Sequence, residues 1–302
     1  MSQLPIYFLL SLPLVGAFAM FALGVVTIYQ ASRVLNLAHG AMAMVPVYVV
    51  FELSAHGVPL VFAVILGVVS GAVLGVVLER VFIRVLRKQS ATAQTVGTVA
   101  ALGILVSFTA KIFGTTPRVA VNVFPDGGIQ VSASLLRYGH IGLFFVAILA
   151  SALFFALFRY TDFGLAMRAA AQNRRAAALM GVDADLTTAA AWAMGGALAA
   201  LGGILLAPVT TLHPYSLTLI VLPAFVAALM GGLESFSGAL IGAAIVGVAQ
   251  GMVPAMGLIP VVDRFASQVG AAQVVVGLVA FTLMYLRGDR ISSSDVRAEI
   301  AT

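Results

Sequence analysis

The sequence is built from apolar blocks of about 20 residues, separated by short stretches that carry charges, prolines and glycines. An α-helix of that length crosses the hydrocarbon layer of a membrane, which is roughly 30 Å thick. Hydrophobic residues make up 62% of the 302 residues and charged residues only 9%. A soluble domain carries about 25% charged residues, so the pattern predicts an all-α fold, a polytopic bundle of transmembrane helices.

About nine apolar blocks are candidate spans, within a range of about eight to ten. The second, seventh and eighth are short or interrupted by glycine, proline and polar residues, and we expect the second to be broken. The blocks are residues 6–30, 34–53, 57–79, 95–114, 138–158, 187–208, 217–232, 236–253 and 270–286.

The basic residues predict the orientation of the chain. With the N-terminus outside, twelve of the 16 lysines and arginines fall on the inner side. Short loops rich in lysine and arginine stay in the cytoplasm, so we predict the N-terminus outside, the C-terminus inside and an odd number of spans. The four outer basic residues are Lys111, Arg118, Arg137 and Arg264.

Two connections are longer than the rest. Segment 115–137 has turn residues followed by alternating apolar residues, which predicts a short extracellular hairpin. Segment 159–185 is the longest cytoplasmic connection. The other connections leave no room for a soluble domain, so residues 1–302 are predicted to form a single transmembrane domain.

Several chemistries are excluded by missing residues. The chain has no cysteine, and its four histidines are dispersed, so no metal site is expected. Neither lysine, Lys88 or Lys111, follows a phosphate-binding glycine loop, so the chain is not expected to bind ATP or to be an enzyme. The net charge of +5 is explained by the membrane rather than by nucleic acid.

The stretch 32–41 places Asn36, His39 and Gly40 at the edge of the second block. It predicts a helix that starts late or is broken at membrane depth, where free backbone groups can serve a polar substrate. The local residues alone favour a purely structural interpretation. In that case Asn36 caps a helix and His39 bonds a neighbouring carbonyl.

Residues 161–182 predict one short cytoplasmic helix rich in alanine and arginine. Thr161 or Asp162 would cap its start, and Gly181 would end it in the left-handed conformation. The helix could rest on anionic lipid or dock into a cytoplasmic partner, and its charges favour neither.

Small residues recur in stretches 195–203 and 231–242, where they would let helix backbones approach closely. Glu234 lies between two short blocks and could contact a partner or face water. The glycines expected to pack between helices are Gly195, Gly196, Gly202, Gly203, Gly231, Gly232, Gly238 and Gly242.

Taken together, these stretches resemble the permease subunits of the branched-chain amino acid family of ABC importers. The resemblance covers nearly the whole chain. It rests on the order of an Asn-hydrophobic-Ala-His-Gly motif, a Glu-Arg…Arg-x-Leu-Arg turn, a coupling loop and two glycine-rich spans. These motifs lie at 35–40, 79–87, 164–182, 197–205 and 230–242.

The resemblance implies a permease that pairs with a second homologous permease and two cytoplasmic ATPases, which would hold ATP and magnesium. An extracytoplasmic substrate-binding protein would deliver the substrate, and the lipid bilayer would be the bacterial inner membrane. It places Asn36, His39 and Gly40 along the substrate pathway. Within the coupling loop, about 159–185, it implies ATPase coupling through Gly164, Arg168, Ala170, Arg174, Arg175 and Gly181.

Two positions depart from the family pattern. Arg168 stands where the general permease motif has glutamate, and Glu234 stands where glycine is more usual. The function implied is alternating-access transport of branched-chain amino acids or related small neutral or zwitterionic solutes. The alternatives are a stand-alone channel or facilitator for a neutral solute such as urea, and an ion-coupled carrier, which the scarcity of intramembrane acids disfavours.

Overall fold

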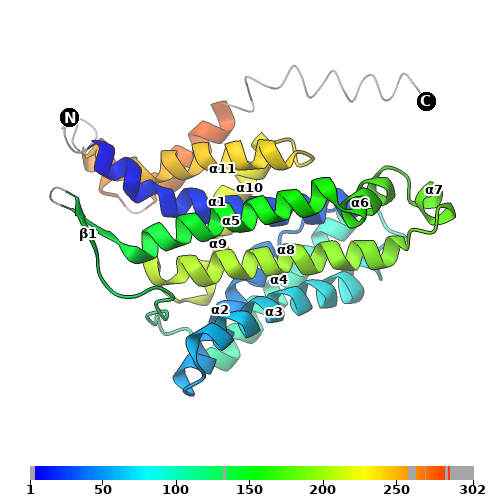
Figure 1. Cartoon of the computed structure of the whole chain (residues 1–302), viewed down its shortest axis with the longest axis horizontal. Helices are drawn as coiled ribbons and strands as arrows, with labels where there is room; N and C mark the ends of the chain where they lie inside the picture. Colours follow the sequence, from blue (N-terminus) through cyan, green and yellow to red (C-terminus); the bar gives the residue numbers. More distant parts are fainter. Residues whose placement is uncertain (1–3, 132–133, 258–262, 269, 283–284, 286–302) are drawn as a thin grey trace.

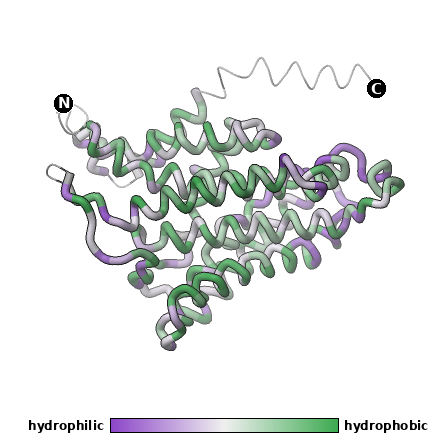
Figure 2. Tube along the Cα trace, in the orientation of Figure 1, coloured by the Kyte–Doolittle hydropathy of each residue, from purple (hydrophilic) through white to green (hydrophobic). Residues whose placement is uncertain are grey.

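The computed structural model describes residues 4–131, 134–257, 263–268, 270–282 and 285. They form a bundle of helices that run side by side along its long axis, with a hairpin at one end and two short helices, α6 and α7, at the other (Figure 1). The hydrophilic segments gather toward these two ends (Figure 2).

The longer helices are α1 (Leu4–Ser32), α2 (His39–Ala55), α3 (Leu60–Leu78), α4 (Ala91–Phe113), α5 (Tyr138–Tyr160), α8 (Ala184–Leu206) and α11 (Phe236–Gly251). The shorter ones are the π-helical turn η1 (Glu79–Ile83), α6 (Asp162–Gln172), α7 (Arg174–Leu179), the 3₁₀ turn η2 (Ala207–Val209), α9 (Pro214–Leu219), α10 (Val221–Met230), α12 (Val253–Met256) and α13 (Asp263–Ala266). A further apolar helix covers Ala271–Thr282.

The described residues contain five helical stretches that are long and apolar enough to cross a membrane. Four shorter apolar helices accompany them, so each predicted block contains an apolar helix. The prediction of a mainly α-helical membrane bundle is confirmed at this level. The end of the ninth block and the basic residues Arg287, Arg290 and Arg297 lie outside the described residues.

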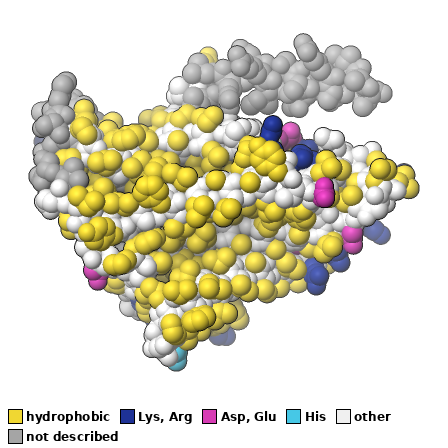
Figure 3. All heavy atoms as spheres, in the orientation of Figure 1, with side chains coloured by type: hydrophobic (Ala, Val, Ile, Leu, Met, Phe, Trp, Pro, Cys, Tyr) yellow, Lys and Arg dark blue, Asp and Glu magenta, His cyan; other side chains and the backbone are white. Residues whose placement is uncertain are grey.

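Helix α1 lies at the centre of the bundle and packs against α5, α8, α10 and α11. Its middle section, which includes Phe18, Phe21 and Leu23, is buried. By contrast, α3, α4 and α5 leave many large apolar side chains exposed. Figure 3 shows such side chains covering one face, with most of its charged side chains gathered toward the α6–α7 end. A surface of this composition suits contact with lipid.

The glycines of α8 lie where other helices approach its backbone. A Cβ atom on Gly195 or Gly202 would meet side chains of α1, and one on Gly203 would come within 2.9 Å of a carbonyl oxygen of α2. A Cβ on Gly196 would overlap a carbonyl oxygen of α3. Without a hydrophobic driving force between helices in lipid, such close approach supplies the packing energy.

The second glycine-rich stretch brings α10 and α11 together. Gly231 and Gly238 face each other, and a Cβ on Gly242 would overlap a carbonyl oxygen of α10. Gly232 takes no part in this packing, because a Cβ there would meet no atom within 4 Å. Its φ of +80° instead lets the chain turn between the two helices.

The second span starts late and is not broken, whereas the seventh span, which the sequence also marks as short or interrupted, is divided. Helix α2 starts late, at His39, and then runs unbroken to Ala55. The seventh block is split into α9 and α10 at Ile220. Pro223 accounts for this position, because its ring conflicts with the carbonyl four residues earlier and it donates no hydrogen bond.

The predicted hairpin is present. Strands β1 (Gly128–Val131) and β2 (Ser134–Arg137) pair antiparallel, with Gly128 opposite Arg137. The preceding loop is fixed by a bridge in which the backbones of Arg118 and Leu212 exchange hydrogen bonds of 3.1 and 3.0 Å. This bridge joins the loop after α4 to the segment before α9.

Candidate functional site

The turn from α5 into α6 is held by three local contacts. Thr161 caps α6 by accepting a hydrogen bond from the Gly164 backbone N–H at 3.3 Å. A side chain at Gly164 would overlap the Phe158 carbonyl oxygen. The Arg168 guanidinium donates to the same carbonyl, where a cation suits the negative end of the α5 dipole. Arg168 therefore holds α6 against α5, and Ala170 lies half-buried further along α6.

The single helix expected over 161–182 is wrong, because Asn173 divides it into α6 and α7. Asn173 has extended backbone angles, φ −151° and ψ 99°, and its side chain accepts from the Ala176 N–H at 2.9 Å. An asparagine that caps a new helix competes with continuation of the old one. Gly181 then has φ +84°, the left-handed conformation expected there.

The end of α7 is an exposed tip, which we define as Arg175, Leu179 and Met180 (Figure 1). Leu179 and Met180 are each 85% exposed. Arg175 is exposed as well, and none of the salt bridges of the described residues involves it. The tip offers apolar surface and a positive charge to whatever lies beyond this end of the bundle.

Behind the tip, three arginines converge on Asp185 in the first turn of α8. Its carboxylate lies 2.7 Å from Arg87 Nη1 and 3.2 Å from Arg84 Nη2. The guanidinium of Arg174, the first residue of α7, also bonds it. The α7 segment is thereby tied to the turn that follows α3.

The same arginines reach a second carboxylate, Glu79, whose side chain is fully buried. Glu79 Oε1 lies 3.3 Å from Arg87 Nη2 and 3.9 Å from Arg84 Nε, while Oε2 has no hydrogen-bond partner among the described residues. Glu79 begins η1, a π-helical turn of a kind that often marks functional sites. We call Glu79, Arg84, Arg87, Arg174 and Asp185 the arginine–carboxylate network.

The network joins residues that the sequence treats separately. The resemblance places Arg174 in the coupling loop, and it places Glu79, Arg84 and Arg87 in the Glu-Arg…Arg-x-Leu-Arg turn of another connection. Asp185 was not singled out. The local signal for Asp185 is an acid in the first turn of a helix, shortly after three arginines. Its pairing with Arg87 spans 98 residues, so no local pattern could predict it.

Glu234 has its partner within the chain. It forms an ion pair with Arg33, and its backbone oxygen accepts from Gln30 Nε2 at 2.5 Å. Arg33, with φ 57°, and Leu233, with φ 60°, are the non-glycine residues at positive φ in the described chain. The contact joins the end of α1 to the α10–α11 turn.

Asn36 folds the segment before α2. Its Oδ1 accepts from the Ala38 N–H at 3.1 Å, and its amide nitrogen lies 3.0 Å from the Met42 sulfur. The adjacent Leu37 N–H donates to Thr98 Oγ1 of α4 at 3.0 Å. Asn36 is thus a buried turn residue, close to the capping interpretation, and it borders a narrow crevice that also includes Trp192.

His39 and Gly40 are buried where α2 meets α1 and α9. The His39 ring is fully buried and lies edge-on to Phe21, with centroids 6.5 Å apart. A side chain on Gly40 would overlap the Thr218 carbonyl oxygen of α9. In the described chain these residues are covered by its own helices.

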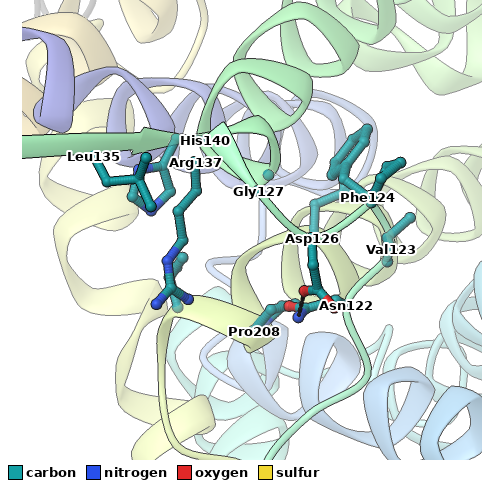
Figure 4. A pocket seen from close by; sticks show the side chains of 13 residues that line it. Asn122, Val123, Phe124, Asp126, Gly127, Leu135, Arg137, His140 and Pro208 are labelled. Carbon is teal, nitrogen blue, oxygen red and sulfur yellow. Dashed lines mark hydrogen bonds between the residues drawn. The ribbon is translucent and has the colours of Figure 1, made fainter. Parts of the chain in front are cut away.

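A hollow of about 240 Å³ lies at the other end of the bundle, beneath the hairpin (Figure 4). We call it the hairpin hollow. Its walls are residues 122–127, the end of β2 with the start of α5, and the end of α8 with η2. Asn122 donates a hydrogen bond of 3.0 Å to Asp126 Oδ1. Figure 4 shows Asp126 and Arg137 on opposite walls.

Similarity to known proteins identifies the family to which the chain belongs. The family model described as the branched-chain amino acid transport system permease component matches residues 7–287. The chain belongs to this family.

Individual relatives agree with the family. The permease is 31% identical over 246 residues to a protein of Methanocaldococcus jannaschii named as a probable branched-chain amino acid transport permease protein, LivH, covering 78% of this chain and 76% of that one. It is 28% identical over 271 residues to the Escherichia coli K12 high-affinity branched-chain amino acid transport system permease protein LivH, covering 83% and 88%. The Pseudomonas aeruginosa permease protein BraD is 25% identical over 252 residues, covering 78% and 81%.

A distant solved structure, PsaBC from Streptococcus pneumoniae in complex with Fab, aligns over 92% of this chain and 89% of its own, with 15% identity and a TM-score of 0.47. Family membership makes the permease a transport component rather than an enzyme. It also does not favour a stand-alone facilitator.

Proposed function

We propose that this permease is the membrane subunit of an ABC importer for branched-chain amino acids or related small neutral or zwitterionic solutes. The family match over residues 7–287 carries the proposal. The exposed α7 tip supports it, because a partner that drives transport needs a surface to push and a connection into the bundle. The arginine–carboxylate network supplies that connection through salt bridges to η1 and α8.

The proposed complex contains a second homologous permease, two cytoplasmic ATPases and an extracytoplasmic substrate-binding protein. ATP and magnesium are held by the ATPases, since this chain has no phosphate-binding glycine loop. Residues 1–302 act as a single transmembrane domain, with residues 159–185 as the coupling loop.

The proposed topology has nine spans in the bacterial inner membrane, with the N-terminus outside and the C-terminus inside. In support, α6, α7 and the arginine–carboxylate network share one end of the bundle, and basic side chains favour the cytoplasmic face. The hairpin and its hollow then face outward.

Transport follows from alternating access between two states of the bundle. ATPase closure moves the α7 tip, Gly164 and Arg168 transmit the movement to α5, and the network transmits it to α3 and α8. In the described state α1, α2 and α9 cover Asn36, His39 and Gly40. When these helices separate, the three residues become exposed to the substrate pathway.

The test is a gentle detergent pull-down of the tagged permease from native membranes, followed by mass spectrometry and ATP-driven leucine uptake in liposomes. We expect a P-loop ATPase and a second permease to copurify, and uptake to need ATP. A stable chain that purifies alone and transports without ATP would contradict the importer and support a facilitator.

A further inference from the structure

We infer that the hairpin hollow is a binding subsite for a zwitterionic amino acid with an aliphatic side chain, at the outer mouth of the permease. This inference rests on the proposed function, which supplies the substrate class and the outward orientation. The assignment depends on three features of the hollow: a wall for a carboxylate, a wall for an ammonium group and an apolar floor.

The carboxylate wall is formed by the end of β2 and the start of α5. Arg137 is the N-cap residue of α5, and its guanidinium reaches into the hollow (Figure 4). No side chain caps this helix, and its first N–H, that of Tyr138, donates to the Gly127 carbonyl oxygen at 3.0 Å. The positive end of the α5 dipole still faces this wall, and a helix N-terminus favours an anion. His140 also lines the hollow, with its Nδ1 buried and without a hydrogen-bond partner among the described residues.

The ammonium wall is formed by the loop before β1. Asp126 faces the hollow opposite Arg137 (Figure 4), and the Asn122 amide holds its carboxylate in place. Neither Asp126 nor Arg137 takes part in a salt bridge among the described residues. An α-amino acid carries its two charges on one carbon, so a single ligand can satisfy both walls.

The floor is apolar. Leu205 and Pro208 from the end of α8 and η2 line it, with Val209 beside them and Phe124 on the loop wall. Leu205 is buried, so the floor is part of the packed bundle rather than a mobile surface. An aliphatic side chain laid here leaves water, which favours it by about 25 cal/mol per Å² buried.

The chemistry also sets what the hollow rejects. A neutral solute such as urea brings no charge to either wall, whereas an amino acid forms hydrogen bonds between opposite charges at both. Because the hollow is open to solvent, binding there is expected to be weak and to serve transfer toward the pathway.

The test measures ligand binding by saturation-transfer NMR on the purified importer in nanodiscs, without its binding protein. The ligands are leucine, leucinamide, which lacks the carboxylate, and 4-methylpentanoate, which lacks the ammonium group. We expect leucine to bind about tenfold more tightly than either analogue, as the loss of one charge-assisted hydrogen bond predicts.

The variants assign each charge to its wall. R137Q is expected to weaken leucine binding about tenfold and to abolish the preference for leucine over leucinamide. D126N is expected to abolish the preference over 4-methylpentanoate. R137K and D126E should restore most binding, which separates charge from folding. K111Q, on the same side at the end of α4, serves as the control and should bind like the parent.

The inference is overturned if leucine binds both neutralised variants normally, or if each variant weakens all three ligands equally. It is also overturned if the variants change uptake only when the binding protein is present, because the charges would then contact that protein. None of these results would contradict ATP-driven uptake by the parent complex. A failure of the proposed subsite is therefore distinguishable from a failure of the proposed importer function.

Discussion

At the scale of single residues, Arg87 bridges the two carboxylates of the arginine–carboxylate network. Glu79 is fully buried, and without Arg87 its nearest cation would be Arg84, at 3.9 Å. Asp185, which is 42% exposed in its side chain, would keep Arg84 and Arg174 and remain partly solvated. The cost of losing Arg87 therefore falls on Glu79.

We expect R87A to destabilise the permease by about 2 kcal/mol, because it leaves a buried carboxylate poorly paired. R84A should cost less than about 1 kcal/mol, since Arg84 is more exposed and leaves Arg87 in place. Thermal unfolding in detergent measures both. The double variant E79Q/R87A should recover part of the loss, and equal effects of the two alanine variants would argue against a special role for Arg87.

Arg175 and Arg174 are neighbours with different surroundings. Arg175 is exposed at the α7 tip, whereas Arg174 bonds Asp185. We expect R175E to lower ATP-driven uptake about tenfold, because the new negative charge at the α7 tip no longer complements the ATPase surface that Arg175 contacts. Thermal stability should stay unchanged. R174E should lower both uptake and stability.

The control for R175E is K88E, which reverses an exposed charge in the turn after η1, outside the coupling loop and outside the arginine–carboxylate network. Uptake at the parental rate by R175E would count against docking at the tip.

At the scale of helices, backbone contact between α3 and α8 depends on glycine. A Cβ atom at Gly75 would overlap the Trp192 carbonyl oxygen, which cannot move without shifting α8. Gly103, in the middle of α4, has open space where its Cβ would be. Gly75 in α3 and Gly103 in α4 both lie inside α-helices. Substituting alanine at each therefore separates the effect of helix propensity from the effect of helix packing.

We expect G103A to be neutral or stabilising by up to about 1 kcal/mol, because alanine is the better helix former. G75A should be destabilising by about 1–3 kcal/mol, because it forces two packed helices apart. Thermal unfolding and the yield of folded protein compare them. A G75A variant as stable as G103A would show that α3 and α8 do not meet as closely as the structure has them.

At the scale of the whole molecule, the two ends of the bundle have different chemistry. One end carries the α7 tip and the arginine–carboxylate network, and the other carries the hairpin and its hollow (Figure 1). An importer needs this polarity, because its driving partner and its substrate come from opposite sides of the membrane.

The absence of cysteine from the sequence allows a direct test of sidedness. A membrane-impermeant maleimide should label N122C in intact cells, because Asn122 is exposed beside the hairpin hollow. M180C, at the 85% exposed end of α7, should be labelled only after the membrane is opened. The cysteine-free parent is the control, and the reverse pattern would invert the proposed topology.

The sequence by itself determined the class of fold, the hairpin and the turn at Gly181. Apolar block length reports a membrane span directly, and turn residues act on their immediate neighbours, so these features need no knowledge of distant contacts. Local rules went wrong at Asn173, where an asparagine outweighed the surrounding helix formers. They were right that the seventh span is interrupted, and Pro223 lies just after the division.

Only the tertiary structure decided which distant residues meet. It placed Asp185 against Arg87, Glu234 against Arg33 and Arg137 across a hollow from Asp126. These juxtapositions depend on how helices pack, through backbone contacts such as Gly75 against Trp192. Packing depends on many small contacts at once, and no pattern along the chain records their sum.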